Sequence, residues 1–392
     1  MKRPVQCRNF LLTCLGVAWL FLHTVSLSAG TGAELEAGFR SPPPSARPWV
    51  FWFWLDGNIT STGITADLEA MARVGLGGAI IMDVSQGIPP GPVKFFDDQW
   101  RNLFRHAVSE AARLNLQIGL HNAPGWCGSG GPWITPEIAM QKVVWSKTNL
   151  VGPMHYSGPL PPLTKSQPPA PETAVLAYPA LRGDTRNAAV FPIPGHQTKT
   201  GMGREPPLDA LPAPPADAVI ARESVRNLSA HLRSDGVLDW DVPAGTWTIL
   251  RFGSMPTGRT NHPARPNGVG LECDKLSWQA VEAHFNAFFK QLIVDAGDEA
   301  GKTFTQMHVD SWEVGFQNWT PEFVKEFRTL RGYDPLPWFP VFSGRYVSSA
   351  DVTQRFLWDV RRTISDLQAR NYAGHLAEAG KKLKMAKFRF RK

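Results

Sequence analysis

The sequence predicts an α/β fold of the (β/α)8-barrel type, interrupted by an inserted β module. Two observations indicate this fold. Apolar β-favouring runs alternate with amphipathic helical runs over residues 49–135 and again over residues 276–380. The alternation stops between roughly Pro136 and Lys275, where proline-rich connections separate short strand-like runs. The length of 392 residues suits one large domain with such an insertion.

The first barrel segment contains three strands and two helices in alternation. The aromatic run 49–55 and the continuous apolar run 78–84 predict buried strands, and a third strand follows at 116–120. Helical spacing of apolar residues predicts helices over 65–74 and 98–114. Successive βα units of this kind predict a parallel sheet with helices outside it.

The inserted segment 136–275 is predicted to be an all-β, sandwich-like module. Its strand-like runs are 174–178, 237–242 and 246–252, and the segment 238–252 is typical of a hairpin that turns at Pro243–Gly245. The helical rhythm then returns with an amphipathic helix over 276–296 and a fourth strand over 305–309. Further helices are expected over 321–331 and 349–383.

The two ends of the chain explain its formal charge of +7. Residues 1–29 carry three bases and residues 381–392 carry seven, with no acid in either, so the remainder holds 31 bases against 34 acids. A net charge of −3 argues against a basic nucleic-acid-binding surface on the body of the fold. Nucleic acid is therefore not an expected partner.

The basic start, the uncharged run 10–22 and the small residues after it predict a secretory signal peptide over 1–29. We expect cleavage near residues 28–33 and export to the periplasm or the extracellular space, with an uncleaved anchor as the alternative. A proline-rich linker, residues 30–48, follows, and no stable membrane span is expected after cleavage. Cys7 and Cys14 belong to the signal; whether Cys127 and Cys273 pair is left open.

Polar and aromatic residues gather where each predicted barrel strand ends. In such barrels the loops after the strands build the site, so these residues are candidates for it. Indole faces stack on the C–H faces of sugar rings and Asp or Asn bind hydroxyls, so the set suits a carbohydrate. The candidates are Trp52, Trp54, Asp56 and Asn58 after the first strand, Asp83 in the second, His121, Asn122 and Trp126 at the third, and His308, Asp310, Trp312 and Glu313 at the fourth.

Asp310 and Glu313 are the candidate catalytic carboxylates. They lie three residues apart where a barrel strand opens into its loop, and glycoside hydrolysis needs one carboxyl group as acid and a second as base or nucleophile. Asp83 has the alternative of a structural hydrogen-bond acceptor in a buried strand. His121 and His308 could be metal ligands with Asp310, but the chain lacks the spacings of common zinc motifs around them.

Four segments resemble glycoside hydrolase family 106, the α-L-rhamnosidases. They are residues 47–58, 63–71, 121–137 and His308-Val-Asp-Ser-Trp-Glu313, and the similarity extends from about residue 47 to about residue 380. The resemblance implies an inverting exo-hydrolase that removes terminal α-L-rhamnose from a rhamnose-containing oligosaccharide or glycoside. It also implies a calcium ion that helps to hold the sugar hydroxyls. Glu313 matches the family's general acid, with Asp310 beside it.

The resemblance fails at the catalytic base, which in the family is a glutamate on a later barrel strand. Here the chain reads as a basic tail over 381–392, outside the family pattern, where a buried fifth strand should follow. Burying those charges in a barrel would be prohibitive, so we expect a frameshift or premature stop and a barrel that is about half complete. An open edge on the fourth strand, low solubility and little or no hydrolysis are then expected.

Two other functions remain open at this point. A metal-dependent barrel hydrolase would use His121, His308 and Asp310, and loss of a transition metal on chelation would favour it. A non-catalytic carbohydrate-binding fragment would keep the aromatic site without a second carboxylate. Binding of rhamnosides without turnover would support that reading.

Overall fold

The structure is a computed structural model that describes residues 32–165, 170–181, 184, 191–204, 213–382 and 387–390. The chain divides into two compact units, residues 1–47 and 48–392. In the first unit, helix α2 (Gly32–Arg40) and the 3-10 turn η1 (Pro44–Ala46) contain no buried residue, so a short helix occupies part of the predicted linker. The predicted signal peptide, with Cys7 and Cys14, lies outside the described residues.

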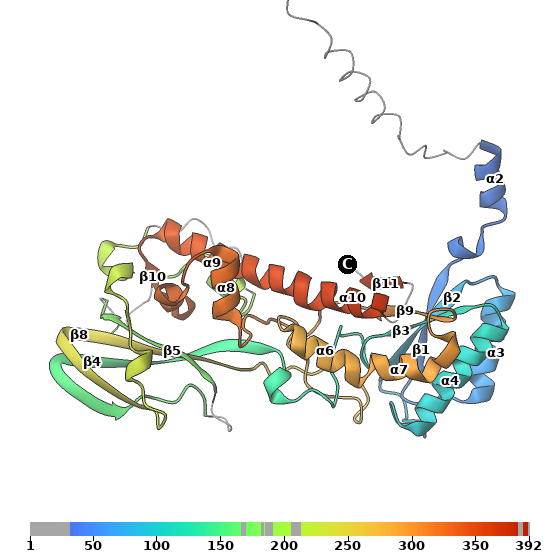
Figure 1. The fold of residues 1–392 in the computed structure, drawn as a ribbon, viewed down its shortest axis with the longest axis horizontal. Coiled ribbons are helices and arrows are strands. Elements are labelled where there is room, and N and C mark those ends of the chain that lie inside the picture. The colour runs from blue at the N-terminus through green and yellow to red at the C-terminus, as the bar shows by residue number, and fades with distance from the viewer. Residues whose placement is uncertain are drawn as a thin grey trace, which may run out of the picture. The chain divides into compact units, whose positions relative to one another are not determined.

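The second unit contains a five-stranded parallel sheet with the order β1-β2-β3-β9-β11 (Figure 1). The alternation of strands and helices predicted for residues 49–135 is confirmed. The strands are β1 Trp49–Leu55, β2 Gly78–Val84, β3 Gln117–His121, β9 Phe304–Val309 and β11 Lys387–Phe390. The helices that pack beside them are α3 Ser61–Arg73, α4 Asp98–Arg113, α6 Trp278–Ala287, α7 Phe289–Ala296 and α10 His375–Lys382.

Local sequence signals explain where these helices begin and end. The Thr60 hydroxyl accepts the N–H of Gly63 to cap α3, and an Asp97 carboxylate oxygen accepts the N–H of Trp100 at 2.8 Å to cap α4. The predicted helix over 276–296 is instead two helices, because Phe288 leaves helical geometry with φ −119° and ψ −76°.

Alternation along the strands separates two faces of the sheet. Trp52 and Trp54 of β1 point to the face covered by helices and belong to the main core cluster, which includes Trp100, Phe104 and Phe304. Phe51 and Phe53 point to the opposite face and are 38% and 47% exposed. That second face also carries Ile80, Met82 and Val84 of β2.

Strand β9 contains a bulge that changes which of its residues share a face. Ile118 lies opposite Phe304 and Gly119 lies opposite Gln306, so Thr305 is an extra residue in the ladder. Phe304 and Met307 therefore both belong to the helix-side core although they are three residues apart. His308 is left for the opposite face, where its ring lies 5.4 Å from that of Phe51.

The basic tail takes part in the sheet, which corrects the sequence prediction. Lys387–Phe390 form β11 and pair in parallel with β9, Lys387 opposite Gln306 and Phe390 opposite Val309. The fourth predicted strand is therefore not an open edge. Backbone N–H and C=O groups form the hydrogen bonds that hold an edge strand in place, and basic residues carry these groups just as apolar residues do. The charge of the tail therefore did not exclude a strand.

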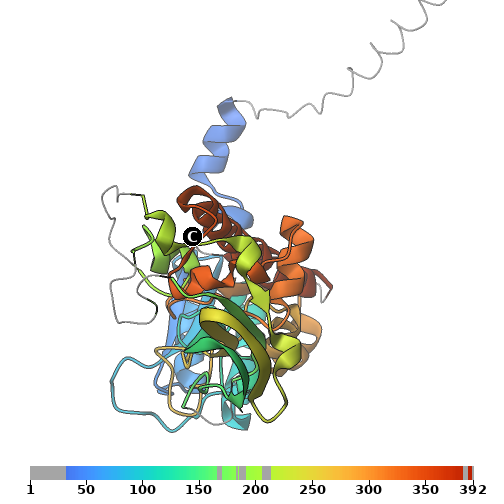
Figure 2. The ribbon, with the colours of Figure 1, turned by 90° about the vertical axis from the view of Figure 1, so that its left-hand side faces the viewer.

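The inserted segment forms a four-stranded antiparallel sheet with the order β4-β8-β5-β7. Figure 2 shows its two long strands in green and yellow. The strands are β4 Gln141–Pro159, β5 Glu172–Pro179, β7 Arg226–Asn227 and β8 Val237–Pro256. One face packs Phe252 against Phe339, so among the described residues the second layer is helical rather than a second sheet.

The predicted hairpin at Pro243–Gly245 is wrong. Residues 237–256 are one strand that pairs with β4 along its length, from Gln141 opposite Pro256 to Pro159 opposite Val237. The Pro and Gly residues coincide with a register irregularity, where Gly245 lies opposite Gly152. This turn-like sequence produces a bulge rather than a hairpin, because the register of the partner strand β4 is also interrupted there, between Gly152 and Met154.

The remaining helices connect the two sheets. Helix α9 (Ala350–Leu367), a π-helical turn η8 (Gln368–Gly374) and α10 follow one another, in red along the upper side of Figure 1. Helix α8 (Phe323–Arg331) and the 3-10 segment η7 (Leu336–Ser343) pack against the antiparallel sheet. The short elements are β6 Val219–Ile220, which pairs with β10 Tyr346–Val347, α5 His196–Thr200 and the 3-10 turns at Pro136–Ile138, Ala216–Ala218, Arg222–Ser224, Ser229–His231 and Gly297–Glu299.

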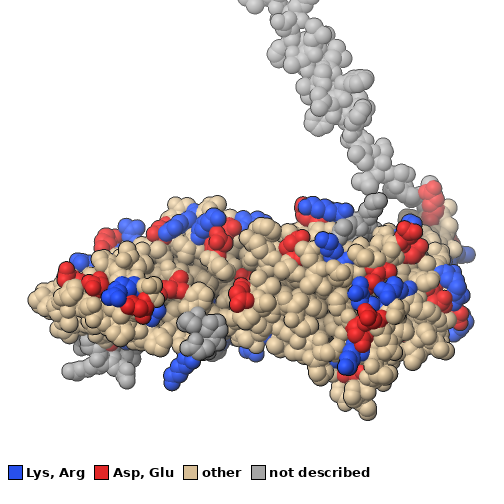
Figure 3. All heavy atoms as spheres, turned by 60° about the horizontal axis from the view of Figure 1, so that its bottom comes forward, with Lys and Arg blue, Asp and Glu red and all other residues tan. Residues whose placement is uncertain are grey.

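The molecular surface mixes charges of both signs. On the face shown in Figure 3, Lys and Arg lie interspersed with Asp and Glu over a largely uncharged surface. Within the described residues, no helix has both the length and the apolar character needed to cross a bilayer.

Candidate active site

The carboxyl ends of β1, β2, β3 and β9 lie along one edge of the parallel sheet, so the four predicted clusters meet there. The Asp56 N–H donates to Val84 O at 2.9 Å, and the Asn122 N–H donates to His308 O at 2.8 Å. The His121 and His308 rings lie 5.9 Å apart. Neighbouring strand ends therefore bring the predicted residues together, as the barrel rule implies.

Asp83 is held as a structural acceptor. The Arg265 guanidinium donates to both of its oxygens, at 3.1 and 2.8 Å, and the Trp100 indole N–H donates at 2.8 Å. Burial raises the pKa of Asp83 to about 6, with Arg265 and Trp100 acting in the opposite direction. Both carboxylate oxygens of Asp83 accept hydrogen bonds, from Arg265 and from Trp100. This geometry favours the role of a structural hydrogen-bond acceptor for Asp83.

Asp56 belongs to the same cluster but is bound mainly by backbone. It has a left-handed φ of 48°, and its carboxylate accepts the Gln86 N–H at 2.8 Å. Burial alone would raise the pKa of Asp56, but hydrogen bonds from Ser85 and Gln86 and the charge of Arg265 outweigh it and lower the pKa.

Three of the predicted aromatic and amide contacts have structural partners instead of facing a pocket. The Trp52 indole N–H donates to Asp67 at 3.0 Å, and Trp54 is 1% exposed within the core. Asn58 donates to Pro89 O at 3.0 Å and is exposed. Trp126 is half-buried beside the β2 residues of the second sheet face.

Hydrogen bonds fix the neutral tautomer of His121. Its Nδ1 donates to Ala123 O at 2.5 Å, and its Nε2 accepts the backbone N–H of Asp310 at 3.3 Å. Burial lowers the pKa of His121 to about 3. Both ring nitrogens are therefore engaged, and His121 positions Asp310 rather than presenting itself to a metal.

A pocket of about 470 Å³ opens beside Asp310. It lies between the irregular segment that follows β9 and the π-helical turn η8. The lining residues include Asp310, Ser311, Trp312, Lys275, Gln368 and Tyr372. An indole, a carboxylate and hydroxyls around a space of this size suit a sugar ring.

Glu313 lies next to this pocket with an exposed carboxylate. The Ser311 hydroxyl donates to its Oε1 at 2.5 Å, which ties the two side chains of the same loop together. Trp312 between them is 36% exposed, and its indole N–H donates to Gly315 O. The predicted Asp310, Trp312 and Glu313 thus form one group at the carboxyl end of β9.

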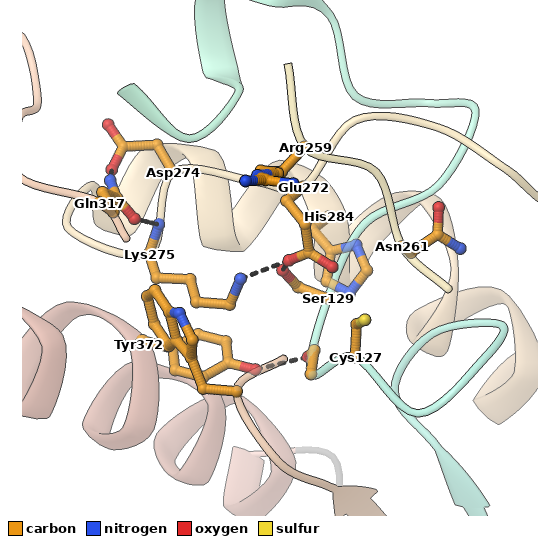
Figure 4. A network of polar contacts seen from close by, with 12 residues as sticks. Cys127, Ser129, Arg259, Asn261, Glu272, Asp274, Lys275, His284, Gln317 and Tyr372 are labelled. Carbon is orange, nitrogen blue, oxygen red and sulfur yellow. Dashed lines mark hydrogen bonds and ion pairs between the residues drawn. The ribbon is translucent and has the colours of Figure 1, made fainter. Parts of the chain in front are cut away.

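The wall of the pocket contains buried charges that the sequence analysis missed (Figure 4). Glu272 and Lys275 form an ion pair, and their side chains are 0% and 1% exposed. The Ser129 hydroxyl donates to the same Glu272 oxygen at 2.7 Å. Asp274 nearby accepts the Thr320 hydroxyl at 2.7 Å, and burial raises its pKa to about 6.

Cys127 and Cys273 are free thiols in the structure. Burial raises the pKa of each to about 12, so both are protonated at neutral pH and neither is an activated nucleophile. The His262 backbone N–H contacts the Cys127 sulfur at 3.3 Å, which gives this thiol a packing role.

The residues that could bind the implied calcium ion do not form a carboxylate cluster. Over the described residues, no three side chains of His, Cys, Asp or Glu come together as possible metal ligands. A calcium ion held mainly by side-chain carboxylates therefore does not fit this part of the chain.

The chain has the fold of a glycoside hydrolase. The chain matches the α-L-rhamnosidase family, glycoside hydrolase family 106, over residues 40–181 and 192–390, and it belongs to that family. The match includes most of the basic tail, which agrees with the pairing of β11.

Two relatives show how the chain compares with longer proteins. A rhamnosidase from Novosphingobium sp. PP1Y has a similar structure, with a TM-score of 0.78 and 28% sequence identity over 91% of this chain and 47% of that chain. A Formosa agariphila protein that bears the provisional name beta-glucuronidase is 42% identical over 354 residues, which are 88% of this chain and 29% of that protein. The chain spans less than half the length of either.

Proposed function

We propose that this chain carries the sugar-binding pocket and general acid of an exo-acting α-L-rhamnosidase that hydrolyses its substrate with inversion. The observation that carries the proposal is a pocket at the carboxyl end of β9 that is lined by Asp310 and Trp312 and followed directly by Glu313, in a chain of the α-L-rhamnosidase family. We include in this proposal the activity, the substrate and the mechanism of the whole protein.

In this proposal the sugar ring lies against the Trp312 indole while Asp310 and the Ser311 hydroxyl bind ring hydroxyls. Glu313 donates a proton to the leaving oxygen as the bond breaks. Ser311 keeps the Glu313 carboxyl group directed along the loop, and His121 holds the backbone of Asp310. An inverting enzyme also needs a second carboxylate about 6.5–9.5 Å away to activate water, and we assign none within the described residues.

The charge near the pocket favours a neutral sugar over a uronic acid. Lys275 is the one basic residue that lines the pocket, and Glu272 already neutralises it. Asp310 is then the one acidic side chain among the described residues that line the pocket, and its carboxylate would repel that of a uronate. The charges therefore support the activity that the family is named for, rather than the one in the name of the Formosa protein.

We also propose that the parallel sheet is part of a (β/α)8 barrel. The face away from the helices carries Phe51 and Phe53, which remain 38% and 47% exposed. In a closed barrel such side chains fill the interior, so their exposure supports further strands over that face. Export through the predicted signal peptide remains a proposal based on the sequence.

Binding tests the proposal without requiring a complete catalytic centre. Titration of the 392-residue chain with L-rhamnose in a calorimeter should give saturable binding that is lost in Asp310→Asn and Trp312→Ala. Glu322→Gln is the matched control, because Glu322 is an exposed carboxylate nearby that pairs with Lys325. Equal binding by Asp310→Asn, or tighter binding of D-glucuronate than of L-rhamnose, would contradict the proposal.

Turnover distinguishes an enzyme from a binding fragment. If the chain hydrolyses an aryl α-L-rhamnoside, Glu313→Gln should lower kcat by about 10²–10⁴, while Glu322→Gln should not change it. Binding without turnover, lost in the Asp310 variant, would support the non-catalytic carbohydrate-binding reading.

A further inference from the structure

A lysine ammonium is buried in the wall of the proposed sugar pocket. The Lys275 side chain is 1% exposed, and its charge is balanced by Glu272, three residues earlier and fully buried. Glu272 is in turn held by the Ser129 hydroxyl at 2.7 Å from the loop after β3. The other Glu272 oxygen, Oε1, has no hydrogen-bond partner among the described residues. Burying two charges costs desolvation free energy, and a hydrophobic pair at the same two positions would often stabilise a fold equally well.

The position of the ammonium relates it to the pocket. Lys275 Nζ lies 4.6 Å from the centre of the Trp312 ring and 5.7 Å from that of Tyr372 (Figure 4 labels Lys275 and Tyr372). All three residues line the same pocket as Asp310. A cation within about 6 Å of an indole face is attracted by it, and more strongly when the cation is desolvated, as here.

Trp312 lies on an irregular loop. The segment 310–322 between β9 and α8 has no helix and only an isolated bridge at Trp319, and the Trp312 indole N–H donates within this segment to Gly315 O. Tyr372, by contrast, comes from the π-helical turn η8, and its hydroxyl donates to Gly128 O. Among the described residues, the Lys275 ammonium links the Trp312 ring to Glu272 and Ser129, which lie outside that segment.

We propose that Lys275 is a positioning residue, whose buried ammonium holds the Trp312 indole in the orientation that receives the sugar. Glu272 and Ser129 hold the Lys275 ammonium in place. Ser129 in the loop after β3 is thereby linked, through Glu272 and Lys275, to Trp312 in the loop after β9. The part of this proposal that concerns sugar binding rests on the proposed function. The orientation of the Trp312 ring does not depend on it.

The test removes both charges together. Glu272→Gln with Lys275→Met avoids leaving one buried charge unpaired, and Glu322→Gln with Lys325→Met removes a Glu–Lys pair of the same i,i+3 spacing on the surface. The protein is labelled with 5-fluorotryptophan, the Trp312 fluorine resonance is assigned with Trp312→Phe, and L-rhamnose binding is titrated in parallel.

We expect the Trp312 resonance of the buried-pair variant to shift, and its change in chemical shift between H2O and D2O, which measures the exposure of the ring to solvent, to increase. L-rhamnose affinity should fall at least about tenfold there, and neither readout should change in the surface-pair variant. An unchanged Trp312 resonance with unchanged affinity would overturn the proposal. A shifted resonance in a chain whose wild type does not bind L-rhamnose would uphold the positioning role and count against the proposed function.

If the buried-pair variant does not fold, Lys275→Arg decides the question. A guanidinium also stacks on an indole and keeps the charge for Glu272, so the H2O/D2O isotope shift of the Trp312 resonance should stay at its wild-type value. A larger isotope shift in a folded Lys275→Arg protein would overturn the proposal.

Discussion

The Trp133 indole N–H donates to Nδ1 of His284 at 2.9 Å, and the opposite ring nitrogen of His284 donates to Asn122 O at 2.9 Å. Because an indole can only donate and a carbonyl can only accept, His284 must be the neutral tautomer with its proton on Nε2. Helix α6 is thereby bound to the carboxyl end of β3, one residue beyond His121.

This pair of histidines predicts acid sensitivity. Burial lowers the pKa of His284 to about 4 and that of His121 to about 3, while an unfolded histidine has a pKa near 6.5. Below pH 6.5 the unfolded chain takes up protons that the folded chain does not, so stability falls as the pH decreases toward 4. Each histidine should contribute about 1.4 kcal/mol per pH unit in that range.

Urea denaturation between pH 7.5 and 4.5 measures this slope. His284→Gln keeps an acceptor and a donor, so it should reduce the slope by one histidine's share. His231→Gln, at an exposed histidine, should leave the slope as it is. A slope that is the same in all three proteins would show that the buried imidazoles titrate normally.

Arg265→Met should be strongly destabilising. It leaves the buried Asp83 carboxylate with the Trp100 indole and without its cation, which costs about 3–5 kcal/mol of unfolding free energy. Arg328→Met breaks an ion pair with Asp334 in which both side chains are about half exposed, and should cost at most about 1 kcal/mol. Similar losses in the two variants, measured by urea denaturation, would contradict a structural role for Asp83.

Gly57→Ala should destabilise through close approach as well as backbone strain. Gly57 has φ +76°, and a Cβ there would lie 2.1 Å from Val93 O. Gly75 has φ +84° with no atom within 4 Å of its added Cβ, so Gly75→Ala measures the strain alone, about 1–2 kcal/mol. A Gly57→Ala protein no less stable than Gly75→Ala would show that the loop after β1 can move away from Val93.

A chain that ends at Lys382 tests the edge strand. Without β11 the backbone groups of β9 from Gln306 to Val309 lose their partner, so we expect a lower Tm and concentration-dependent aggregation. Light scattering during thermal unfolding measures both. Equal Tm and equal scattering in the shortened chain would mean that β11 adds nothing to the sheet.

The parts of the fold that follow from local pattern could be predicted. Strand β2 is apolar except for Asp83 and is buried throughout, and α4 has both a capping aspartate and an apolar stripe. The group Asp310, Trp312 and Glu313 could also be located directly after β9, because the carboxyl end of a parallel strand determines where the following loop begins. These predictions needed no knowledge of distant partners.

Other parts depend on partners far along the chain. Trp52 and Trp54 were candidates for sugar contact, yet the faces of β1 depend on where the helices pack. Arg265 was not among the candidates, and its pairing with the distant Asp83 explains its burial. Lys275 was not among them either, although its partner Glu272 is only three residues away. A weak signal existed in the charges of Glu272, Asp274 and Lys275 directly before the apolar start of α6.

The bulge at Thr305 lets β9 contain one residue more than its pairing with β3 requires. If Thr305 were deleted, Phe304 and Met307 would stand two residues apart, as in a regular strand, and both would stay on the helix side of the sheet. His308 would stay on the opposite face, and the loop that carries Asp310 would leave the sheet in the same direction. Strand β9 can therefore lose one residue at the bulge without a change in the faces of the residues that follow it, whereas a deletion within residues 306–309 would interchange those faces.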